Sequence, residues 1–362
     1  MKIFIVGYTH TKDDKRVFKT VELLSKKHEV IYQYLSTDKE ESYRKNNITY
    51  IPLKISNILG RRTRFENIKN LVKFDKKIIN LIKNVEYDIL YLHYFLVMFP
   101  LKAFKIAKKK GKTVVYDVHE YHPENHLKNF KGVKKTLKEN FMWYILKKQF
   151  FLSDKLIFVS KEMQLDMFKK TDVKKPYLIV PNYANILLKS KKVKEIAFVG
   201  KTPRNIRFEK EIIKKLFSFG FSFKIIGMDS EYFKDIPHEY TSFLPYGKMM
   251  KELSRASFSL ISYKSFGSEK KNYQYSFPHK FFDSIAANTP VIVNERFISM
   301  SKEVKKHGLG VIINPENVEK SVDKIVNAYE NYEVILKNIE KYKKLYVWDK
   351  EKEENFVNFV TK

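Results

Sequence analysis

Short apolar runs alternate with longer segments of helical periodicity along the first half of the chain. The runs KIFIVG (2–7), EVIYQYL (29–35) and ITYIPL (48–53) have the length and composition of buried parallel strands. Residues 14–27 and 64–84 place apolar side chains at helical spacing. The alternation predicts further strands at 87–93, 113–119, 155–160 and 178–183, and further helices at 97–110 and 132–151.

The second half repeats this alternation after a charged connector at 185–195. We expect strands at 196–200, 223–227, 241–244, 257–262, 290–293 and 310–314. A polar loop is expected at 264–276. The pattern predicts helices at 207–218, 247–255, 278–287, 299–306, 317–345 and 348–360.

Strands that alternate with helices are typical of parallel sheets covered on both faces. With 362 residues and one connector, the pattern predicts an α/β protein of two Rossmann-like, doubly wound domains facing a central cleft. We place the N-terminal domain at 1–188 and the C-terminal domain at 189–345. A closing helix at 346–362 is expected to pack back on the first domain.

The composition excludes several classes of protein. There is no cysteine, which rules out disulfides and thiolate chemistry and fits a reducing cytoplasm. The start of the chain lacks the apolar core of a signal peptide, and no run of about 18 uncharged apolar residues favours a membrane span. We therefore expect a cytoplasmic protein.

The charge is strongly positive and uneven. Seventy basic and 41 acidic residues give a net charge of +29. Residues 1–200 hold 42 basic and 20 acidic side chains, a net +22, whereas residues 201–362 hold 28 and 21, a net +7. The asymmetry favours an anionic partner, such as phosphorylated ligands or the anionic inner face of a membrane, although a bias of the whole composition towards lysine is the alternative. No nucleic-acid-binding motif accompanies the charge, so nucleic acid is not expected.

The first polar cluster is YDVHEYHPE at 116–124, directly after a predicted strand. An imidazole at a strand's carboxyl end is typical of an active-site loop, where it can act as an acid, a base or a hydrogen-bond donor. His119 and His122 together could instead ligate a metal, and a loop capped by Asp117 is the purely structural alternative.

Two further clusters lie in the second half. Gly200 ends a strand and is followed by Lys201, Arg204 and Arg207 near a predicted helix start, an arrangement that suits a diphosphate. The segment NYQYSFPHKFFDSIAANTPVIV (272–293) places Lys280 and Asp283 on one helix face, where a surface ion pair is the simpler explanation.

Taken in order, these segments resemble the GT-B glycosyltransferases, in particular family 4. KDDKRVFKTVELLSKKHEV (12–30) is similar to the family's D-x-R-V opening, YDVHEYHPE to its YD-x-HE loop, and FVGK to its strand that ends in Gly and a cation. The 272–293 segment is similar to the family's P-x-K-x-x-E motif before PVI. The resemblance covers nearly the whole chain.

The resemblance implies retaining transfer of a sugar from a UDP- or GDP-linked donor, without a metal or other cofactor. The acceptor would be a glycan or lipid-linked precursor in bacterial surface polysaccharide synthesis, such as capsule, lipopolysaccharide or teichoic acid. His119 would be the catalytic residue, and Glu120 and His122 would lie on the acceptor side. The donor-binding residues would be Gly7, Tyr8, Gly200, Lys201, Arg204, Arg207, Tyr275, Lys280 and Asp283.

The chain departs from the family pattern at three places. Tyr275 replaces the first of the family's paired Glu residues, Asp283 replaces the second, and Asn288 with Thr289 replaces a Gly. The departures leave two alternatives open, a non-catalytic or decayed nucleotide-binding protein and an inverting GT-B enzyme. The expected activity is nevertheless that of a hexosyltransferase-type glycosyltransferase.

Overall fold

The computed structural model describes residues 1–38, 40–55, 64–94, 96–125, 127, 130–200, 207–227, 230–263 and 270–362. It divides into two compact units, one of Met1–Val180 with Glu351–Lys362, the other of Pro181–Lys350. The division comes before Pro181 and not after residue 188, because the chain already packs on the second unit there. Asn182 donates a hydrogen bond to the carbonyl of Phe277, and the Leu188 amide donates one to Ala286.

The first unit contains an eight-stranded sheet in the order β3-β4-β2-β1-β5-β6-β7-β8. Every neighbouring pair is parallel except β3 with β4. The strands carry continuous apolar stretches, as expected for a sheet covered on both faces. Their bounds are β1 Lys2–Thr11, β2 Glu29–Ser36, β3 Tyr43–Lys45, β4 Ile48–Lys54, β5 Ile89–Leu92, β6 Thr113–Val118, β7 Lys155–Phe158 and β8 Tyr177–Ile179.

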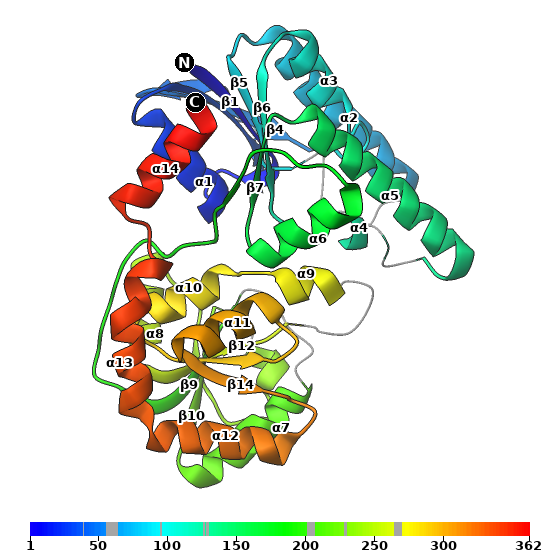
Figure 1. Ribbon diagram of the computed structural model, residues 1–362. Helices are drawn as coiled ribbons and strands as arrows, with labels where there is room; N and C mark the ends of the chain where they lie inside the picture. The colour runs from blue at the N-terminus through cyan, green and yellow to red at the C-terminus, as the bar shows by residue number, and fades with distance from the viewer. Residues whose placement is uncertain are drawn as a thin grey trace. The chain divides into compact units, whose positions relative to one another are not determined.

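Helices cover both faces of this sheet (Figure 1). The last helix of the chain lies beside the first helix. The carboxylate of Glu353 forms ion pairs with the ammonium groups of Lys19 and Lys26, at N–O distances of 3.1 and 2.8 Å. One acid of the closing helix therefore meets a lysine within the opening helix and the lysine that directly follows it. The helices of the unit are α1 Lys15–Ser25, α2 Arg64–Asn84, α3 Lys102–Lys109, α4 His122–Asn125, α5 Gly132–Leu152, α6 Lys161–Thr171 and α14 Lys350–Thr361.

The second unit contains a fully parallel six-stranded sheet in the order β11-β10-β9-β12-β13-β14. One apolar core gathers side chains of α8, α10, α11 and α13, and another those of α7 and α12. The strands are β9 Val193–Val199, β10 Ser222–Ile226, β11 Glu239–Thr241, β12 Ala256–Ile261, β13 Val291–Asn294 and β14 Gly310–Ile313. The helices are α7 Arg207–Leu216, α8 Tyr246–Arg255, α9 Lys270–Tyr275, α10 His279–Ala286, α11 Ile298–His307, α12 Val318–Glu330 and α13 Tyr332–Tyr342, with one-turn 3₁₀ helices at Phe217–Phe219, Ser230–Phe233 and Lys343–Tyr346.

Four local expectations from the sequence differ from the structure. The first strand continues past Gly7 to Thr11, with a register shift against β2. Helix α6 follows β7, where no helix was predicted, and α9 forms within the expected polar loop. The expected helix at 317–345 breaks at Asn331, because the backbone of Asn331 leaves helical geometry and serves as a cap for both α12 and α13.

Each sheet has one point where the strand order reverses. In the first unit β1 lies between β2 and β5, and in the second unit β9 lies between β10 and β12. Ligands of open parallel sheets bind outside the carboxyl ends of the strands at such a point. The loops after β1 and β5, and those after β9 and β12, are therefore where a site is expected in each unit.

Helix α5 exposes an apolar stripe along its whole length. Val133, Leu137, Phe141, Tyr144 and Phe151 recur every three, four or seven residues, and each side chain is more than half exposed. Its opposite face is buried through Ile145, Leu146, Gln149 and Phe150. Among the described residues, no helix is both long and apolar enough to span a bilayer.

Candidate functional site

The carboxyl edge of the first sheet gathers two imidazoles, a carboxylate and a guanidinium. His93 directly follows β5, Asp117 is the last residue but one of β6, and His119 is the first residue after that strand. Arg16 reaches this edge from the first turn of α1. Since β5 and β6 are neighbours and run in parallel, both strands end at the same place, which brings residues 26 positions apart into contact.

Asp117 is the centre of this cluster. Its Oδ1 accepts a hydrogen bond from Arg16 Nη2 at 2.7 Å, and its Oδ2 accepts one from the Tyr91 hydroxyl at 2.9 Å. Arg16 also donates through Nη1 to the carbonyl of Val180 at 2.7 Å. Burial alone would raise the pKa of Asp117, but the charge of Arg16 and the neighbouring imidazoles hold it well below the usual range. The carboxylate is therefore ionised at any physiological pH.

The two imidazoles contact each other beside this carboxylate. His93 Nδ1 lies 2.9 Å from His119 Nε2, and each of these atoms lies 3.5 Å from an oxygen of Asp117. His93 is completely buried, and burial holds its pKa well below 6.5. Burial also lowers the pKa of His119, against the opposing charge of Asp117. Both rings are neutral at pH 7, and the side chain of His119 keeps 10% of its surface exposed.

A third histidine, His10 of β1, flanks the cluster. The ring of His10 lies 5.3 Å from that of His119, and His10 Nδ1 contacts Asp14 Oδ2 at 3.1 Å. Asp14 also caps α1 by accepting from the amides of Arg16 and Val17. The sequence analysis did not select His10, Arg16 or His93. Two of them could have been found from the sequence, because Arg16 belongs to the D-x-R-V opening and His93 lies at the end of a predicted strand.

Gly7 and Tyr8 do not present the ligand-lining loop that the sequence predicts. Tyr8 is 1% exposed, and its hydroxyl donates to Asp75 Oδ1 at 3.0 Å. It adopts a φ of 54°, and its amide is held by the side chain of Gln33. A Cβ at Gly7 would come within 2.8 Å of the Gln33 carbonyl. Strand β1 is irregular here and turns the phenol inward, and the donor-binding role expected of both residues stays a prediction.

The two residues expected on the acceptor side differ in exposure. Glu120 is exposed, as a contact with an acceptor requires. His122 begins α4 and is 1% exposed, with its ring 4.7 Å from that of Tyr94. The expectation that His122 faces an acceptor is therefore wrong in this structure, because the short helix packs the imidazole among aromatic rings.

A metal fits this edge poorly. His93, Asp117 and His119 offer ligand atoms within 4.8 Å of one another, and His122 is not part of this group. Arg16 already neutralises the carboxylate, and a cation would have to displace that guanidinium and break the contact between the rings. These residues fit a hydrogen-bonded network better than a metal site.

The carboxyl edge of the second sheet combines a glycine contact with a cation. Gly200 follows β9, and the backbone after β10 approaches so closely that a Cβ at Gly227 would lie 3.0 Å from the Gly200 carbonyl. Arg207 is exposed and begins α7. Lys201 and Arg204, the other two predicted cations, lie outside the described residues.

Lys280 is positioned at this same edge. Its ammonium lies 5.1 Å from the ring centre of Phe198 in β9 and 4.9 Å from that of Tyr263, which follows β12. The ammonium is thus held by aromatic rings at the carboxyl ends of β9 and β12, two neighbouring strands at the reversal point of this sheet. Glu209, which the sequence analysis missed, is buried nearby in the first turn of α7 and accepts from Ser262 at 2.6 Å.

Asp283 and Tyr275 occupy different environments. Asp283 is 4% exposed, and its Oδ1 accepts a hydrogen bond from the Tyr246 hydroxyl at 2.8 Å. The simple alternative of a surface ion pair with Lys280 does not hold, since the carboxylate turns to α8. Tyr275 ends α9, and its carbonyl accepts from Ser299.

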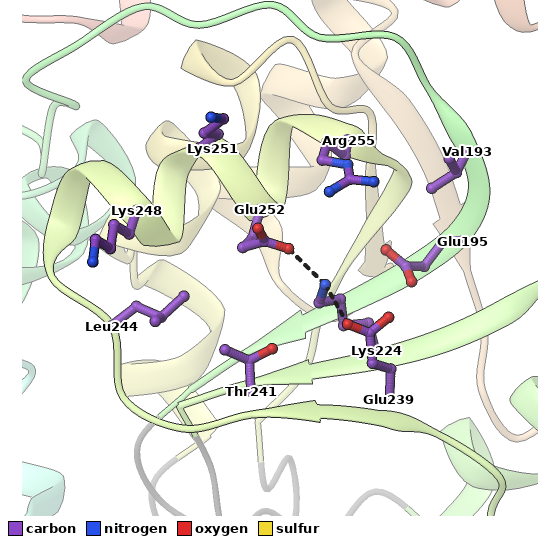
Figure 2. A pocket seen from close by; sticks show the side chains of 10 residues that line it. All are labelled: Val193, Glu195, Lys224, Glu239, Thr241, Leu244, Lys248, Lys251, Glu252 and Arg255. Atoms are coloured by element: carbon purple, nitrogen blue, oxygen red, sulfur yellow. Dashed lines mark hydrogen bonds and ion pairs between the residues drawn. The ribbon is translucent and has the colours of Figure 1, made fainter.

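The second unit also has a cavity of about 710 Å³ between α8 and the strands β9, β10 and β11. Figure 2 shows Lys224 at its centre, held by Glu252 at 2.6 Å and Glu239 at 2.8 Å. Val193, the first residue of β9, and Arg255, the last before β12, also line it. The cavity therefore extends from the amino end of β9 to the carboxyl end of β11, and Lys224 at its centre is already paired. We do not assign the diphosphate to it.

We predict that stability falls as the pH drops below about 6.5, partly through His93. An unfolded histidine has a pKa near 6.5. Because the folded-state pKa of His93 lies below this value, the unfolded chain binds more protons between the two, and the free energy of unfolding decreases there. Each unit by which folding lowers the pKa of His93 corresponds to about 1.4 kcal/mol of unfolding free energy.

Thermal unfolding between pH 7.5 and 5 measures this effect, with wild type compared with His93→Asn. The variant should lose less stability over this range. A matched control is His28→Asn, since burial lowers the pKa of that half-exposed residue only partly. Equal losses in wild type and His93→Asn would contradict the prediction.

Two family models match the chain, one after the other. Glycosyltransferase Family 4 matches residues 17–186, and the C-terminal domain of the Glucosyltransferase 3-like family matches residues 196–347. No sequence among the curated proteins matches. Each model covers most of one structural unit, so both halves are independently similar to glycosyltransferase domains.

Solved structures agree on the fold. Sucrose-phosphate synthase from Thermosynechococcus elongatus has a TM-score of 0.69 at 12% identity, with 99% of this chain and 97% of that chain covered. WaaG, a glycosyltransferase involved in lipopolysaccharide biosynthesis, has a TM-score of 0.68 at 11% identity, with 99% of each chain covered.

Anabaena HepE, in a complex with UDP, has a TM-score of 0.65 at 12% identity, with 99% of this chain and 98% of that chain covered. These likenesses, at such low identity, establish the fold. Together with the two family models, they show that the chain is a glycosyltransferase of the GT-B type, similar to family 4.

Proposed function

We propose that this enzyme transfers a sugar from a UDP- or GDP-linked donor to a glycan or lipid-linked acceptor, with retention of configuration. The single observation that carries the proposal is the neutral, partly exposed imidazole of His119 at the carboxyl edge of the first sheet, in contact with His93 after β5 and His10 of β1. Its position is that of the catalytic-loop histidine in the family 4 resemblance. Arg16 and Tyr91 donate hydrogen bonds to Asp117 at this edge.

The reaction needs little from the protein beyond binding and charge stabilisation. The bond between the anomeric carbon and the diphosphate oxygen breaks, and the diphosphate keeps the electron pair. The acceptor hydroxyl attacks the same face of the sugar, and its proton passes to the departing diphosphate oxygen. Cations near that oxygen stabilise its charge in the transition state. No metal or other cofactor enters this scheme.

The second unit would bind the nucleotide part of the donor. Lys280 brings a positive charge to the reversal point, and Arg207 stands at the start of α7, where helix amides favour anions. Asp283 would bind the ribose, and Tyr275 would lie near the donor sugar, as the resemblance implies. That HepE was solved with UDP supports a nucleotide ligand of this type.

We further propose that the enzyme acts at the inner face of the cell membrane in surface polysaccharide synthesis. The apolar stripe of α5 is accompanied by five lysines within the same helix and only one acid. A helix of this kind can lie in the interface of an anionic membrane. The role of WaaG in lipopolysaccharide biosynthesis supports an acceptor that is assembled at a membrane.

Replacing His119 by alanine should lower turnover by about 10²-fold or more, because a positioned imidazole is lost at the reacting centre. Nucleotide binding should persist. Release of UDP or GDP from a panel of nucleotide sugars measures turnover, and proton NMR of the fresh product reports the anomer. His28→Ala is the matched control. Near wild-type turnover of His119→Ala would contradict the proposal, and an inverted product would contradict retention.

Replacing Lys280 by methionine should weaken nucleoside diphosphate binding much more than nucleoside binding, since the charge acts on the phosphates. Asp283→Ala should raise KM more than it lowers kcat, because ribose contacts act equally in the ground and transition states. Calorimetry with UDP, GDP and their nucleosides measures both effects.

Two controls separate these roles from simple structural effects. Arg255→Met removes a cation of the cavity beside α8; this residue ends α8 directly before the amino end of β12, away from the carboxyl edge, and its replacement should leave binding unchanged. Tyr246→Phe removes the hydrogen bond to Asp283 but keeps the carboxylate. If Tyr246→Phe weakens binding as much as Asp283→Ala, the carboxylate serves the fold and not the ribose.

Replacing Leu137, Phe141 and Phe151 by serine should abolish binding to anionic vesicles, because the apolar anchor is lost. Flotation with phosphatidylglycerol vesicles and with neutral phosphatidylcholine vesicles, at low and high salt, measures this. Each lysine near an anionic surface contributes about 1 kcal/mol, so binding should weaken with salt. Exposed apolar residues of the second unit, Phe219 and Val334, provide a serine control. Absence of binding by wild type at low salt would contradict the membrane proposal.

A further inference from the structure

His93 reaches the candidate catalytic residue without being accessible itself. It is 0% exposed, its Nδ1 lies 2.9 Å from His119 Nε2, and its Nε2 is buried with no hydrogen-bond partner. His119 shows the reverse asymmetry. Its Nε2 is occupied, whereas its Nδ1 is not enclosed and has no hydrogen-bond partner among the described residues. The two rings therefore have only one nitrogen between them that a ligand could reach.

The position of the proton on His93 follows from its surroundings. A proton on Nε2 would leave a buried N–H with no acceptor, and would turn the lone pair of Nδ1 towards the Asp117 carboxylate 3.5 Å away. A proton on Nδ1 instead faces both His119 Nε2 and that carboxylate. Orphaned buried N–H groups are rare, and buried acceptors without partners are less costly. The proton of neutral His93 therefore lies on Nδ1.

The tautomer of His119 follows in turn. If His93 Nδ1 donates to His119 Nε2, that nitrogen is an acceptor and carries no proton. Its lone pair then lies 3.5 Å from Asp117 Oδ1, an oxygen whose charge Arg16 compensates, which costs less than the orphaned N–H of the alternative. Neutral His119 then holds its single proton on Nδ1, the accessible nitrogen. In proteins the tautomer of one histidine nitrogen is set by the hydrogen bond that the other makes.

The charged groups around the pair keep this arrangement neutral. Asp117 on β6 faces both rings, but its charge is already compensated by Arg16 from α1 and its second oxygen accepts from Tyr91 on β5. From β1, His10 contacts the ring of His119 and is itself held by Asp14. No carboxylate among the described residues is free to draw a second proton onto either ring.

We infer that His93 is a positioning residue, which holds His119 as the Nδ1–H tautomer so that His119 donates a hydrogen bond to the donor substrate and does not remove a proton from the acceptor. The inference deepens the proposed function and rests on the role given there to His119. It agrees with a reaction in which the departing diphosphate takes the acceptor proton. The target of the Nδ1–H group would be an oxygen of the bound nucleotide sugar.

Nitrogen-15 NMR of histidine-labelled enzyme tests the tautomer without any need for activity. Long-range proton–nitrogen correlation distinguishes a protonated ring nitrogen from a bare one, and the signals of His119 are those absent from His119→Ala. We expect a protonated Nδ1 and a bare Nε2 in His119 of the wild type at pH 7.5. His93→Asn, whose amide can donate from the place of Nδ1, should keep this pattern. His93→Leu should lose it.

Kinetics separate positioning from structure. His93→Leu should lower kcat by about tenfold to 10²-fold at little change in KM, as expected when a catalytic group is misplaced, and His93→Asn should recover part of the loss. A protonated Nε2 on His119 in the wild type overturns the inference, as does a His93→Asn variant no more active than a folded His93→Leu. If the tautomer is as stated but His119→Ala retains activity, the proposed function of His119 fails and the pairing of the rings stands.

Discussion

The buried ion pair between Arg16 and Asp117 is the interaction on which the site in the first unit depends. The two side chains are 9% and 2% exposed, and their contact is 2.7 Å long. Removing one partner of such a pair leaves an uncompensated buried charge, which typically costs about 3–5 kcal/mol. The same pair joins α1 to the end of β6 and, through the carbonyl of Val180, to the end of β8. It also keeps the neighbouring imidazoles from facing a bare carboxylate.

Both units gather charged or titratable side chains at the carboxyl edge of a sheet, but with opposite electrostatics. The first unit compensates its charges and leaves a neutral imidazole, His119, as the accessible group. The second unit brings an ammonium, that of Lys280, onto aromatic rings at the ends of two strands. A neutral donor of hydrogen bonds suits an uncharged sugar, and a cation suits a diphosphate.

The surface of α5 contributes to the charge asymmetry, since the helix carries five lysines and one acid. Lysines on this helix flank exposed aromatic and aliphatic side chains, which would be costly in water over so long a stripe. The two faces of this helix differ, because Leu146 and Phe150 are buried in the first unit while Leu137 and Phe141 are exposed on its surface.

The sequence by itself determined the α/β class, nearly every strand, the strand-end position of His119 and Gly200 and the helical position of Lys280, because buried strands, polar strand ends and helical spacing are local patterns. Only the tertiary structure decided which strands are neighbours. For that reason the partners of His119 could not be found from spacing, since His93 is 26 residues away. It also decided the direction of side chains at irregular backbone, where the bulge at Tyr8 and the short helix at His122 turn both rings inward. Such burial depends on packing from distant segments, which no local pattern contains.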